Sequence, residues 1–282
     1  MNQTTKLIAM KRILSLLIPP LLIRGLHFFR KGPHIEFSGS YLTWVDAKSK
    51  SEGYESPAIL EKCKQALLKV KNGEAPYERD SVVFNDVNYN YGLLAGLLRC
   101  ALENKGRLSV LDFGGSLGST YYQNKDFLSG VTQLEWSIVE QTHFVECGQE
   151  NFEDEQLKFY KSVEDCLGKR NPNVLILSGV LQYLDNPVNW ISKFINLQFP
   201  YIIVSRTPFI DSEQDVLSVQ TVPASIYEAS FPHLFFSKKV FLSHFLGHNF
   251  TVVSTYPSFA DEDYALENGK VARWEDFIFK RL

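Results

Sequence analysis

The sequence predicts an α/β fold built on a mostly parallel sheet, and three observations support this prediction. From residue 107 onward, apolar runs of four to six residues alternate with helical stretches. These runs are continuously apolar, as expected of strands that helices cover on both faces. One run leads directly into a glycine-rich turn, and in such folds ligands bind beyond the carboxyl ends of the strands.

By composition the chain divides into residues 1–35, a basic and apolar arm, residues 36–105, a helical extension, and residues 106–282, which contain the sheet. In the extension, the segments 57–70 and 91–104 are expected to be helices, the first with Ser56 as its N-cap and Pro57 in its first turn. Seven strands, flanked by helices, are expected in the sheet: Ser109–Phe113, Glu135–Val139, Leu157–Tyr160, Val174–Leu177, Tyr201–Ser205, Thr251–Tyr256 and Asp276–Lys280.

The composition is that of an ordinary globular protein. Of 282 residues, 45% are hydrophobic, 13% aromatic and 22% charged, which excludes disordered, collagen-like and coiled-coil classes. The net charge of −3 argues against a nucleic-acid partner. The four cysteines show no C-x-x-C or zinc-site spacing, so no metal site is expected and the thiols are predicted to be reduced, as in a cytoplasmic protein.

The arm has a charge of its own. Residues 1–35 contain six Lys or Arg and no acid, a net of +6, which leaves −9 on the rest of the chain. Its apolar run of eleven residues, Ile13–Ile23, is interrupted by Pro19 and Pro20 and is shorter than a membrane span of about 20 residues. Two interpretations remain open: a segment that lies on an anionic membrane surface, or an arm packed on the protein itself.

The clearest functional motif follows the first expected strand. Here Asp112 precedes a turn that contains Gly114, Gly115, Ser116 and Gly118, and a helix begins near Ser119. Glycines let the backbone approach a ligand closely, and the helix start supplies N–H groups. The spacing is neither G-x-G-x-x-G nor a P-loop. Because a carboxylate repels a pyrophosphate but attracts a sulfonium and an ammonium, the turn favours S-adenosylmethionine over NAD or ATP.

The second expected strand ends in Glu140, 22 residues after Gly118. An acid at this position can accept hydrogen bonds from the two ribose hydroxyls, as it does in dinucleotide-binding folds. The alternative is an ordinary α/β turn with a capping Asp112.

Polar residues also follow the next two expected strands. The fourth ends in Ser178 and Gly179, with Gln182 and Tyr183 just beyond, and the fifth ends next to Arg206. Arg206 is predicted to bind an anionic acceptor or, alternatively, to pair with Asp211 or Asp215.

Two further segments carry candidate residues. A long connection containing Gln220, Tyr227 and His233 is expected either to cover an acceptor pocket or simply to pack, with His233 as a candidate general base. The cluster Tyr77–Asp80 is expected either to fold over the active site or to form a self-satisfied charged cap.

Several short blocks, in order along the chain, resemble bacterial methyltransferases often encoded among surface-polysaccharide genes. The resemblance covers almost the whole chain after residue 35. The blocks are Phe37–Tyr41 with Trp44, Ser51–Tyr54, Gly73–Ala75, Tyr77–Ser81, Leu111–Gly118, Val139–Gln141, Leu177–Leu184, Ser205–Pro208, Gln220, Val222–Pro223, Tyr227 and Ala229–Pro232. One departure is Ser116, where that family often has a third glycine.

The resemblance implies a Rossmann-like class I methyltransferase fold, with S-adenosylmethionine as cofactor and a small-molecule or saccharide acceptor. On this hypothesis the residues that contact the cofactor are Asp112, Gly114, Gly115, Ser116, Gly118, Glu140, Ser178 and Gly179. Those near the acceptor are Gln182, Tyr183, Arg206 and Tyr227, with His233, Tyr227 and Arg206 as catalytic candidates. The alternative is a non-catalytic nucleotide- or sugar-binding module of the same fold, attached to a membrane assembly complex. A Rossmann dehydrogenase is less well supported, because the loop spacing differs.

Overall fold

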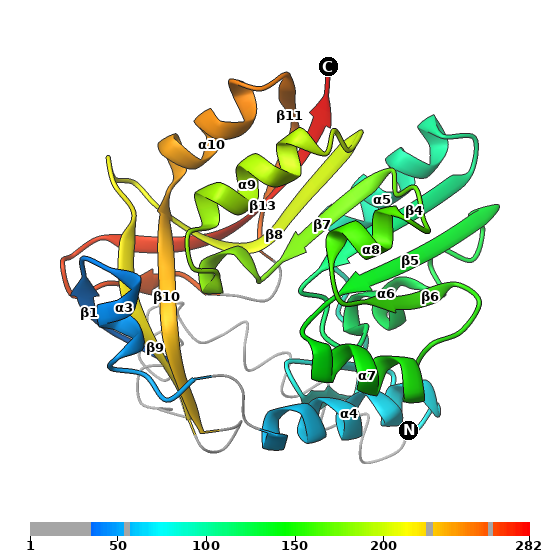
Figure 1. Cartoon of the computed structure of the whole chain (residues 1–282), viewed down its shortest axis with the longest axis horizontal. Helices are drawn as coiled ribbons and strands as arrows, with labels where there is room; N and C mark the ends of the chain where they lie inside the picture. Colours follow the sequence, from blue (N-terminus) through cyan, green and yellow to red (C-terminus); the bar gives the residue numbers. More distant parts are fainter. Residues whose placement is uncertain (1–34, 54–56, 224–227, 259–261) are drawn as a thin grey trace, which may run out of the picture. The chain divides into compact units, whose positions relative to one another are not determined.

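The computed structural model describes residues 35–53, 57–223, 228–258 and 262–282 (Figure 1). Residues 37–282 form one unit of the chain. The arm predicted for residues 1–35 lies outside the described residues except for Ile35, and so do Ser56 and Tyr227. No helix in the described ranges is both long and apolar enough to cross a bilayer.

All seven expected strands are present, and they lie side by side in one sheet. Five are parallel neighbours, in the order β6-β5-β4-β7-β8. Strand β13 pairs antiparallel with β8, and β11 pairs antiparallel with β13. The bounds are β4 (Arg107–Phe113), β5 (Gln133–Val139), β6 (Leu157–Tyr160), β7 (Val174–Ser178), β8 (Tyr201–Ile210), β11 (Phe250–Pro257) and β13 (Val271–Arg281). The predicted α/β fold with a mostly parallel sheet is therefore confirmed.

The chain reverses its direction of travel across the sheet at β4, which has β5 on one side and β7 on the other. Such a reversal opens a crevice at the carboxyl ends of the two strands that flank it. The carboxyl ends of β4 and β7 are therefore the place where this fold positions a ligand.

Helices cover both faces of the sheet because successive residues of a strand point to opposite sides. Val110 belongs to one apolar cluster together with Leu97 and Phe144, and Leu111 belongs to the other together with Phe194. The first cluster includes residues of α4 (Pro57–Lys71), α5 (Tyr91–Glu103), α6 (Ser119–Asn124) and α7 (Thr142–Asn151). The second includes residues of α8 (Val163–Leu167), α9 (Pro187–Asn196) and α10 (Lys238–Leu246).

Four strands beyond the expected seven extend the sheet. The connection predicted between β8 and α10 is an antiparallel hairpin of β9 (Val216–Val222) and β10 (Ala229–Ser237), with β1 (Glu36–Tyr41) beside β9. The fourth, β12 (Tyr264–Ala265), pairs with β13. Pro232 lies inside β10, and a proline usually argues against a strand. It is tolerated here because β10 pairs with β8 only at Phe236 and Ser237.

The extension, residues 36–105, contains both expected helices, α4 and α5, and also elements that were not expected. These are a short helix, α3 (Trp44–Lys48), and a hairpin of β2 (Tyr77–Arg79) and β3 (Val82–Phe84). The hairpin turn consists of Asp80 and Ser81, whose φ angles are 51° and 68°. Two residues with positive φ define a type I′ turn, which normally contains Asn or Gly.

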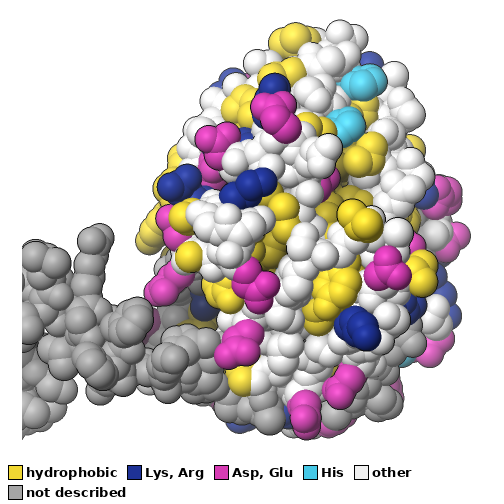
Figure 2. Space-filling model, turned by 90° about the vertical axis from the view of Figure 1, so that its left-hand side faces the viewer, with side chains coloured by type: hydrophobic (Ala, Val, Ile, Leu, Met, Phe, Trp, Pro, Cys, Tyr) yellow, Lys and Arg dark blue, Asp and Glu magenta, His cyan; other side chains and the backbone are white. Residues whose placement is uncertain are grey.

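Acidic and basic side chains are interspersed on the molecular face that Figure 2 shows, and they form no continuous basic stripe there. A nucleic-acid surface would be expected to carry such a stripe.

Candidate functional site

The glycine-rich turn follows β4 and leads into α6. Gly114 and Gly118 have φ angles of 74° and 109°, which favour glycine. A Cβ built on Gly114 would lie 2.5 Å from Cγ2 of Val180, the second residue after β7. A Cβ built on Gly115 would lie 2.7 Å from the Asp112 carboxylate. Both glycines are therefore required for the turn to sit against its neighbours.

Ser116 occupies the position where a third glycine was expected from the resemblance. It nevertheless adopts a left-handed conformation, with φ of 53°. A non-glycine residue in this region is strained by about 1–3 kcal/mol unless its surroundings hold it. Its backbone N–H donates a hydrogen bond to Oε1 of Glu140 at 3.3 Å, which supports the strained conformation.

Glu140 lies directly after β5 and connects the glycine-rich turn to the neighbouring strand. Its Oε2 accepts a hydrogen bond from the backbone N–H of Gln141 at 2.7 Å, while Oε1 accepts the one from Ser116. Burial raises the pKa of the carboxyl group, although these two hydrogen bonds oppose the shift. The structure thus brings together Glu140 and the turn, which the sequence places 22 residues apart.

Asp112 lies beneath the turn, near the end of β4, and is fully buried. Its Oδ2 accepts a hydrogen bond from Trp136 Nε1 at 3.2 Å, and Oδ1 has no hydrogen-bond partner among the residues that the structure describes. Burial, aided by the charge of Glu140, raises the pKa of Asp112 to about 7. A nearby cation would stabilise the ionised form of this carboxyl group.

A second group of predicted residues gathers at the end of β7 and beside Arg206, in the middle of β8. Gly179, after Ser178 at the end of β7, donates its backbone N–H to the carbonyl of Ser205 at 2.9 Å. Gln182, in the 3-10 helix η1 (Leu181–Tyr183), donates from Nε2 to the carbonyl of Arg206 at 3.2 Å.

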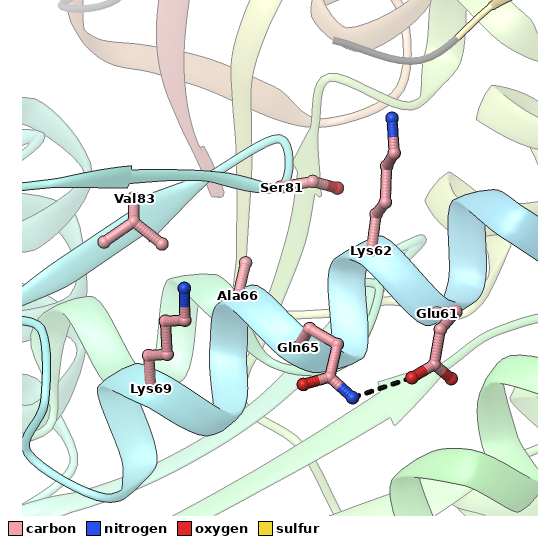
Figure 3. A pocket seen from close by; sticks show the side chains of 7 residues that line it. All are labelled: Glu61, Lys62, Gln65, Ala66, Lys69, Ser81 and Val83. Carbon is pink, nitrogen blue, oxygen red and sulfur yellow. Dashed lines mark hydrogen bonds between the residues drawn. The ribbon is translucent and has the colours of Figure 1, made fainter.

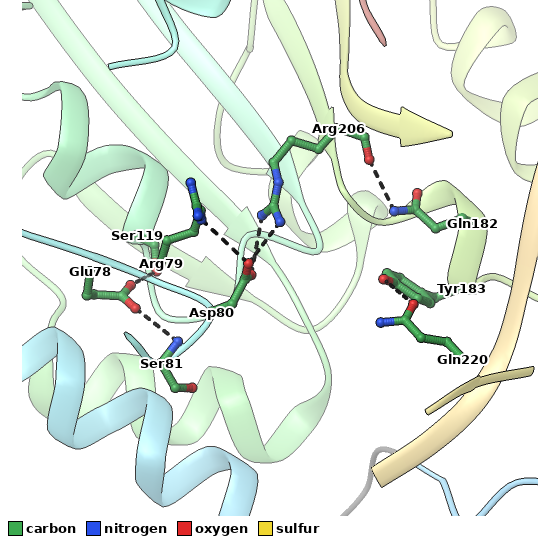
Figure 4. Close-up of polar contacts among 9 residues, drawn as sticks. All are labelled: Glu78, Arg79, Asp80, Ser81, Ser119, Gln182, Tyr183, Arg206 and Gln220. Atoms are coloured by element: carbon green, nitrogen blue, oxygen red, sulfur yellow. Dashed lines mark hydrogen bonds and ion pairs between the residues drawn. The ribbon is translucent and has the colours of Figure 1, made fainter. Parts of the chain in front are cut away.

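The Tyr183 hydroxyl donates to Oε1 of Gln220, on β9, at 3.0 Å (Figure 4). The hairpin of β9 and β10 therefore borders the residues that follow β7.

Arg206 marks a bend in the middle of β8. Its φ of 51° is left-handed, and the strand pairs with β7 before the bend and with β10 after it. The buried carboxylate of Asp276, on β13, fixes the bend. It accepts hydrogen bonds from Arg206 N at 2.9 Å, Ser205 Oγ at 2.8 Å and Asn90 Nδ2 at 2.6 Å.

Among the residues that the structure describes, the Arg206 side chain pairs with Asp80 of the β2–β3 turn, whereas the sequence had suggested Asp211 or Asp215. The guanidinium donates from Nη2 to Oδ2 at 2.8 Å and from Nη1 to Oδ1 at 3.3 Å (Figure 4). Asp215 instead accepts a hydrogen bond from Ser237 N at 2.7 Å. The sequence suggested the wrong acids because the β2–β3 hairpin, which supplies Asp80, is distant from Arg206 in sequence.

The charged cluster of the β2–β3 hairpin contacts both sides of the site. At one end Glu78 accepts a hydrogen bond from the Ser119 hydroxyl, at the start of α6, and one from Ser81 N at 3.3 Å. At the other end Asp80 contacts Arg206. Burial raises the pKa of Glu78 to about 7, although the bond from Ser119 opposes the shift. The cluster is therefore not satisfied by its own residues alone, since it contacts the start of α6 and Arg206 in the middle of β8.

His233 lies on β10 inside an aromatic cluster. Its ring centroid is 4.6 Å from those of Phe37 and Phe235 and 5.3 Å from that of Tyr183. The side chain is buried, and burial lowers its pKa to about 3. A general base works best with a pKa near the operating pH, so these surroundings do not favour the predicted role.

The sequence did not single out three residues that organise the site: Asn90, Ser119 and Asp276. Asn90 caps α5 by accepting a hydrogen bond from Leu93 N at 3.0 Å, and it also binds Asp276. An acid within a predicted apolar strand was the available signal for Asp276, because a buried carboxylate requires hydrogen-bond donors.

The geometry suits an adenosine cofactor with an ammonium group. The turn approaches closely without side chains, Glu140 lies beside it, and a buried carboxylate oxygen of Asp112 has no described partner. Strain also concentrates here: four of the eight described non-glycine residues with positive φ are Asp80, Ser81, Ser116 and Arg206. Strained backbone of this kind clusters at functional sites.

Comparison with known proteins gives only remote similarity. No protein-family model matches the sequence, and no curated protein matches it. A methyltransferase from Methanosarcina mazei, described as S-adenosylmethionine-dependent, is 12% identical with a TM-score of 0.43, over 64% of this chain and 96% of the other.

Two further solved structures are similar to the same degree. The N-terminal domain of EvdMO1, solved with S-adenosylhomocysteine and D-fucose, is 11% identical with a TM-score of 0.45, over 79% of this chain and 97% of the other. CalS10, an amino pentose methyltransferase from Micromonospora echinaspora solved with S-adenosylmethionine, is 9% identical with a TM-score of 0.40. The match covers 69% of this chain and 92% of the other. Similarity this remote says nothing of activity.

Proposed function

We propose that this protein is an S-adenosylmethionine-dependent methyltransferase that acts on a small acceptor, such as a sugar of surface-polysaccharide metabolism. The observation that carries the proposal is the hydrogen bond of 3.3 Å between Ser116 N and Glu140 Oε1. It joins the glycine-rich turn to the acid at the end of the next strand. Both lie at the carboxyl ends of the parallel strands, where the strand order reverses.

Each cofactor-binding residue has a distinct role in this proposal. The backbone of Gly114, Gly115 and Gly118 approaches the cofactor, and Glu140 accepts hydrogen bonds from the ribose hydroxyls. Asp112 attracts the ammonium of the methionine portion, directly or through water. The cofactor supplies an activated methyl group, so the protein mainly aligns donor and acceptor and excludes water.

The acceptor would lie beside Ser178, Gln182, Tyr183 and Arg206, with Tyr227 as a further candidate. A carboxylate acceptor needs no base, whereas a hydroxyl acceptor must lose a proton. Among the buried groups near the turn, Glu78 has a pKa of about 7, and this value suits a proton acceptor better than that of His233.

Calorimetric titration with S-adenosylmethionine, S-adenosylhomocysteine and NAD tests the proposal. We expect both sulfur nucleosides to bind and NAD to give no heat. Binding of NAD alone would instead indicate a dehydrogenase. Absence of heat from all three would contradict the proposal and favour a binding module of the same fold.

We also propose that the protein acts in the cytoplasm, and that residues 1–35 contact the anionic inner face of the membrane. The support is the net charge of +6 next to an apolar run of eleven residues. The test is sedimentation with vesicles of anionic or neutral lipid, with the six basic residues of the arm changed to Gln in the comparison protein. Equal sedimentation of both proteins with anionic vesicles would contradict this proposal.

A further inference from the structure

The Arg206 guanidinium is already arranged to bind an anion. Two of its nitrogens donate to the two oxygens of one carboxylate, that of Asp80. Arg79 lies on the same carboxylate, with Nε 3.9 Å from Oδ2. Paired N–H donors of this kind fit a carboxylate or a phosphate, because both present two oxygens at the right spacing.

This anion position lies beside the predicted methyl-donor site. Nη1 of Arg206 is 3.9 Å from the Cβ that a side chain at Gly179 would have. The next residue, Val180, lies against Gly114 of the glycine-rich turn. A ligand bound to the guanidinium would therefore lie next to the turn.

The Asp80 side of this contact is open to solvent, so a ligand anion can compete with the carboxylate for the guanidinium. The Asp80 side chain is 53% exposed and that of Arg206 is 23% exposed, and solvent weakens ion pairs that it reaches. Both residues, and also Ser81, have positive φ. The charge and hydrogen bonds of Arg206 lower the pKa of Asp80, so Asp80 is an anion at neutral pH.

There is also space behind the hairpin turn. A groove of about 350 Å³ lies beside the turn, lined by Ser81 and Val83 on one side and by α4 on the other, where Glu61 and Gln65 hydrogen-bond to each other (Figure 3). The Ser81 hydroxyl is 3.1 Å from Cys63 Sγ of α4, so exchange at the guanidinium requires only the Asp80 side chain to turn away.

A second observation indicates what else the ligand carries. Gln182 is 2% exposed, and its amide nitrogen is held by the Arg206 carbonyl. Its Oε1 has no hydrogen-bond partner among the described residues, and a buried acceptor of this kind is expected to receive a donor. A hydroxyl group of a ligand at Arg206 would supply that donor.

We infer that Arg206 and Gln182 bind an acceptor that carries an anionic group, carboxylate or phosphate, together with hydroxyl groups, and that this anion exchanges with Asp80 on the guanidinium. Sugar acids and sugar phosphates have this chemistry. The inference names the substrate class of the methyltransferase and therefore rests on the proposed function.

The test is calorimetry at neutral pH with three probes: D-glucuronate, D-glucose 6-phosphate and uncharged D-glucose. The full-length protein is compared with Asp80→Asn, Arg206→Gln and Arg206→Lys, all in saturating S-adenosylhomocysteine. Asp263→Asn is the matched control, because Asp263 forms a similarly exposed pair with Arg273, 3.4 Å apart.

We expect Asp80→Asn to tighten anion binding by about three- to tenfold, because the competing carboxylate is neutralised. Arg206→Gln should weaken it more than about tenfold, and Arg206→Lys less, since the lysine keeps the charge without the paired donors. Asp263→Asn should change nothing, and glucose should respond to none of the variants. Whichever anion responds identifies the group as carboxylate or phosphate.

The inference is overturned if Asp80→Asn leaves the affinity for both anions unchanged or weaker, if glucose gains as much as the anions, or if neither anion binds any form. S-adenosylhomocysteine is titrated first into each variant. Binding of S-adenosylhomocysteine without anion binding would overturn this inference alone, whereas the reverse result would overturn the proposed function.

Discussion

The carboxylate of Asp276 accepts a hydrogen bond from the backbone N–H of Arg206 at 2.9 Å, across a sequence separation of 70 residues. The same carboxylate binds Ser205 and Asn90, so it joins β13, β8 and the start of α5. This contact holds Arg206 in a left-handed conformation and directs its side chain toward Asp80.

Replacing Asp276 with Ala should therefore destabilise the whole unit. The change removes an acceptor that three donors share, and only Asn90 keeps another, the Ser205 hydroxyl, so we expect the free energy of unfolding to fall by about 2–4 kcal/mol. Urea denaturation measures this change, with Asp211→Ala, at an exposed position, as the control. Equal midpoints for the two variants would show that Asp276 does not hold the bend.

Adding a side chain at Gly114 should weaken cofactor binding. In Gly114→Ala the added Cβ would lie 2.5 Å from Val180, on a backbone with φ of 74°, so the turn must shift. We expect S-adenosylmethionine affinity to fall by more than about tenfold, since strain of this kind is worth about 1–3 kcal/mol. Gly130→Ala is the control, because a Cβ there has no neighbour within 4 Å. Unchanged affinity in Gly114→Ala would exclude a close approach of the turn to the cofactor.

Glu140 should contribute directly to cofactor affinity. We expect Glu140→Ala to weaken S-adenosylmethionine binding by about 1–3 kcal/mol, because two ribose hydroxyls lose a charged acceptor. Glu146→Ala, at an exposed residue of α7, should bind normally. Calorimetry measures the S-adenosylmethionine affinity of both variants, and equal affinities would remove Glu140 from the site.

Glu78 should make the stability of the protein depend on pH. Its pKa is raised from 4.5 to about 7, so the folded state favours the protonated form. The stabilisation that this shift provides is complete below pH 4.5 and is lost as the pH rises through 7. The loss amounts to at most about 3 kcal/mol.

In Glu78→Gln that loss should disappear. Denaturation of the original protein and the variant at pH 5 and pH 8 compares the two slopes, with Glu74→Gln as an exposed control. Parallel pH dependence in the original protein and in Glu78→Gln would contradict a buried, ionisable Glu78.

Local patterns account for the parts of the structure that the sequence predicted. Each of the seven expected strands contains a short apolar run, and the two apolar clusters lie on opposite faces of the sheet that these strands form. The turn from Gly114 to Gly118 is likewise encoded within a few residues. The β2–β3 hairpin gave no such pattern, because its strands have three residues each and its Asp-Ser turn contains no glycine.

The features of the site that the sequence did not predict depend on contacts between residues distant in sequence. The partner of Arg206 lies 126 residues away, on a hairpin that was not expected, so local spacing pointed to the wrong acids. Asp276 and Asn90 meet only because β13 returns beside β8 and α5 begins next to both. The sequence left two interpretations of the Tyr77–Asp80 cluster open, a cover over the active site or a self-satisfied charged cap. Its partners Ser119 and Arg206 come within reach only in the folded chain.

The bend at Arg206 also bears on how such a protein diversifies. Residues of β8 before the bend pair with β7, whereas Phe209 and Ile210 pair with β10. The β9–β10 hairpin therefore joins the parallel part of the sheet through the outer half of β8 alone, while β1 pairs with β9 and Tyr183 contacts Gln220. Changes in this hairpin would therefore alter the surroundings of Gln220 and Tyr183, and the pairing of β4 with β5 and β7 would stay as it is.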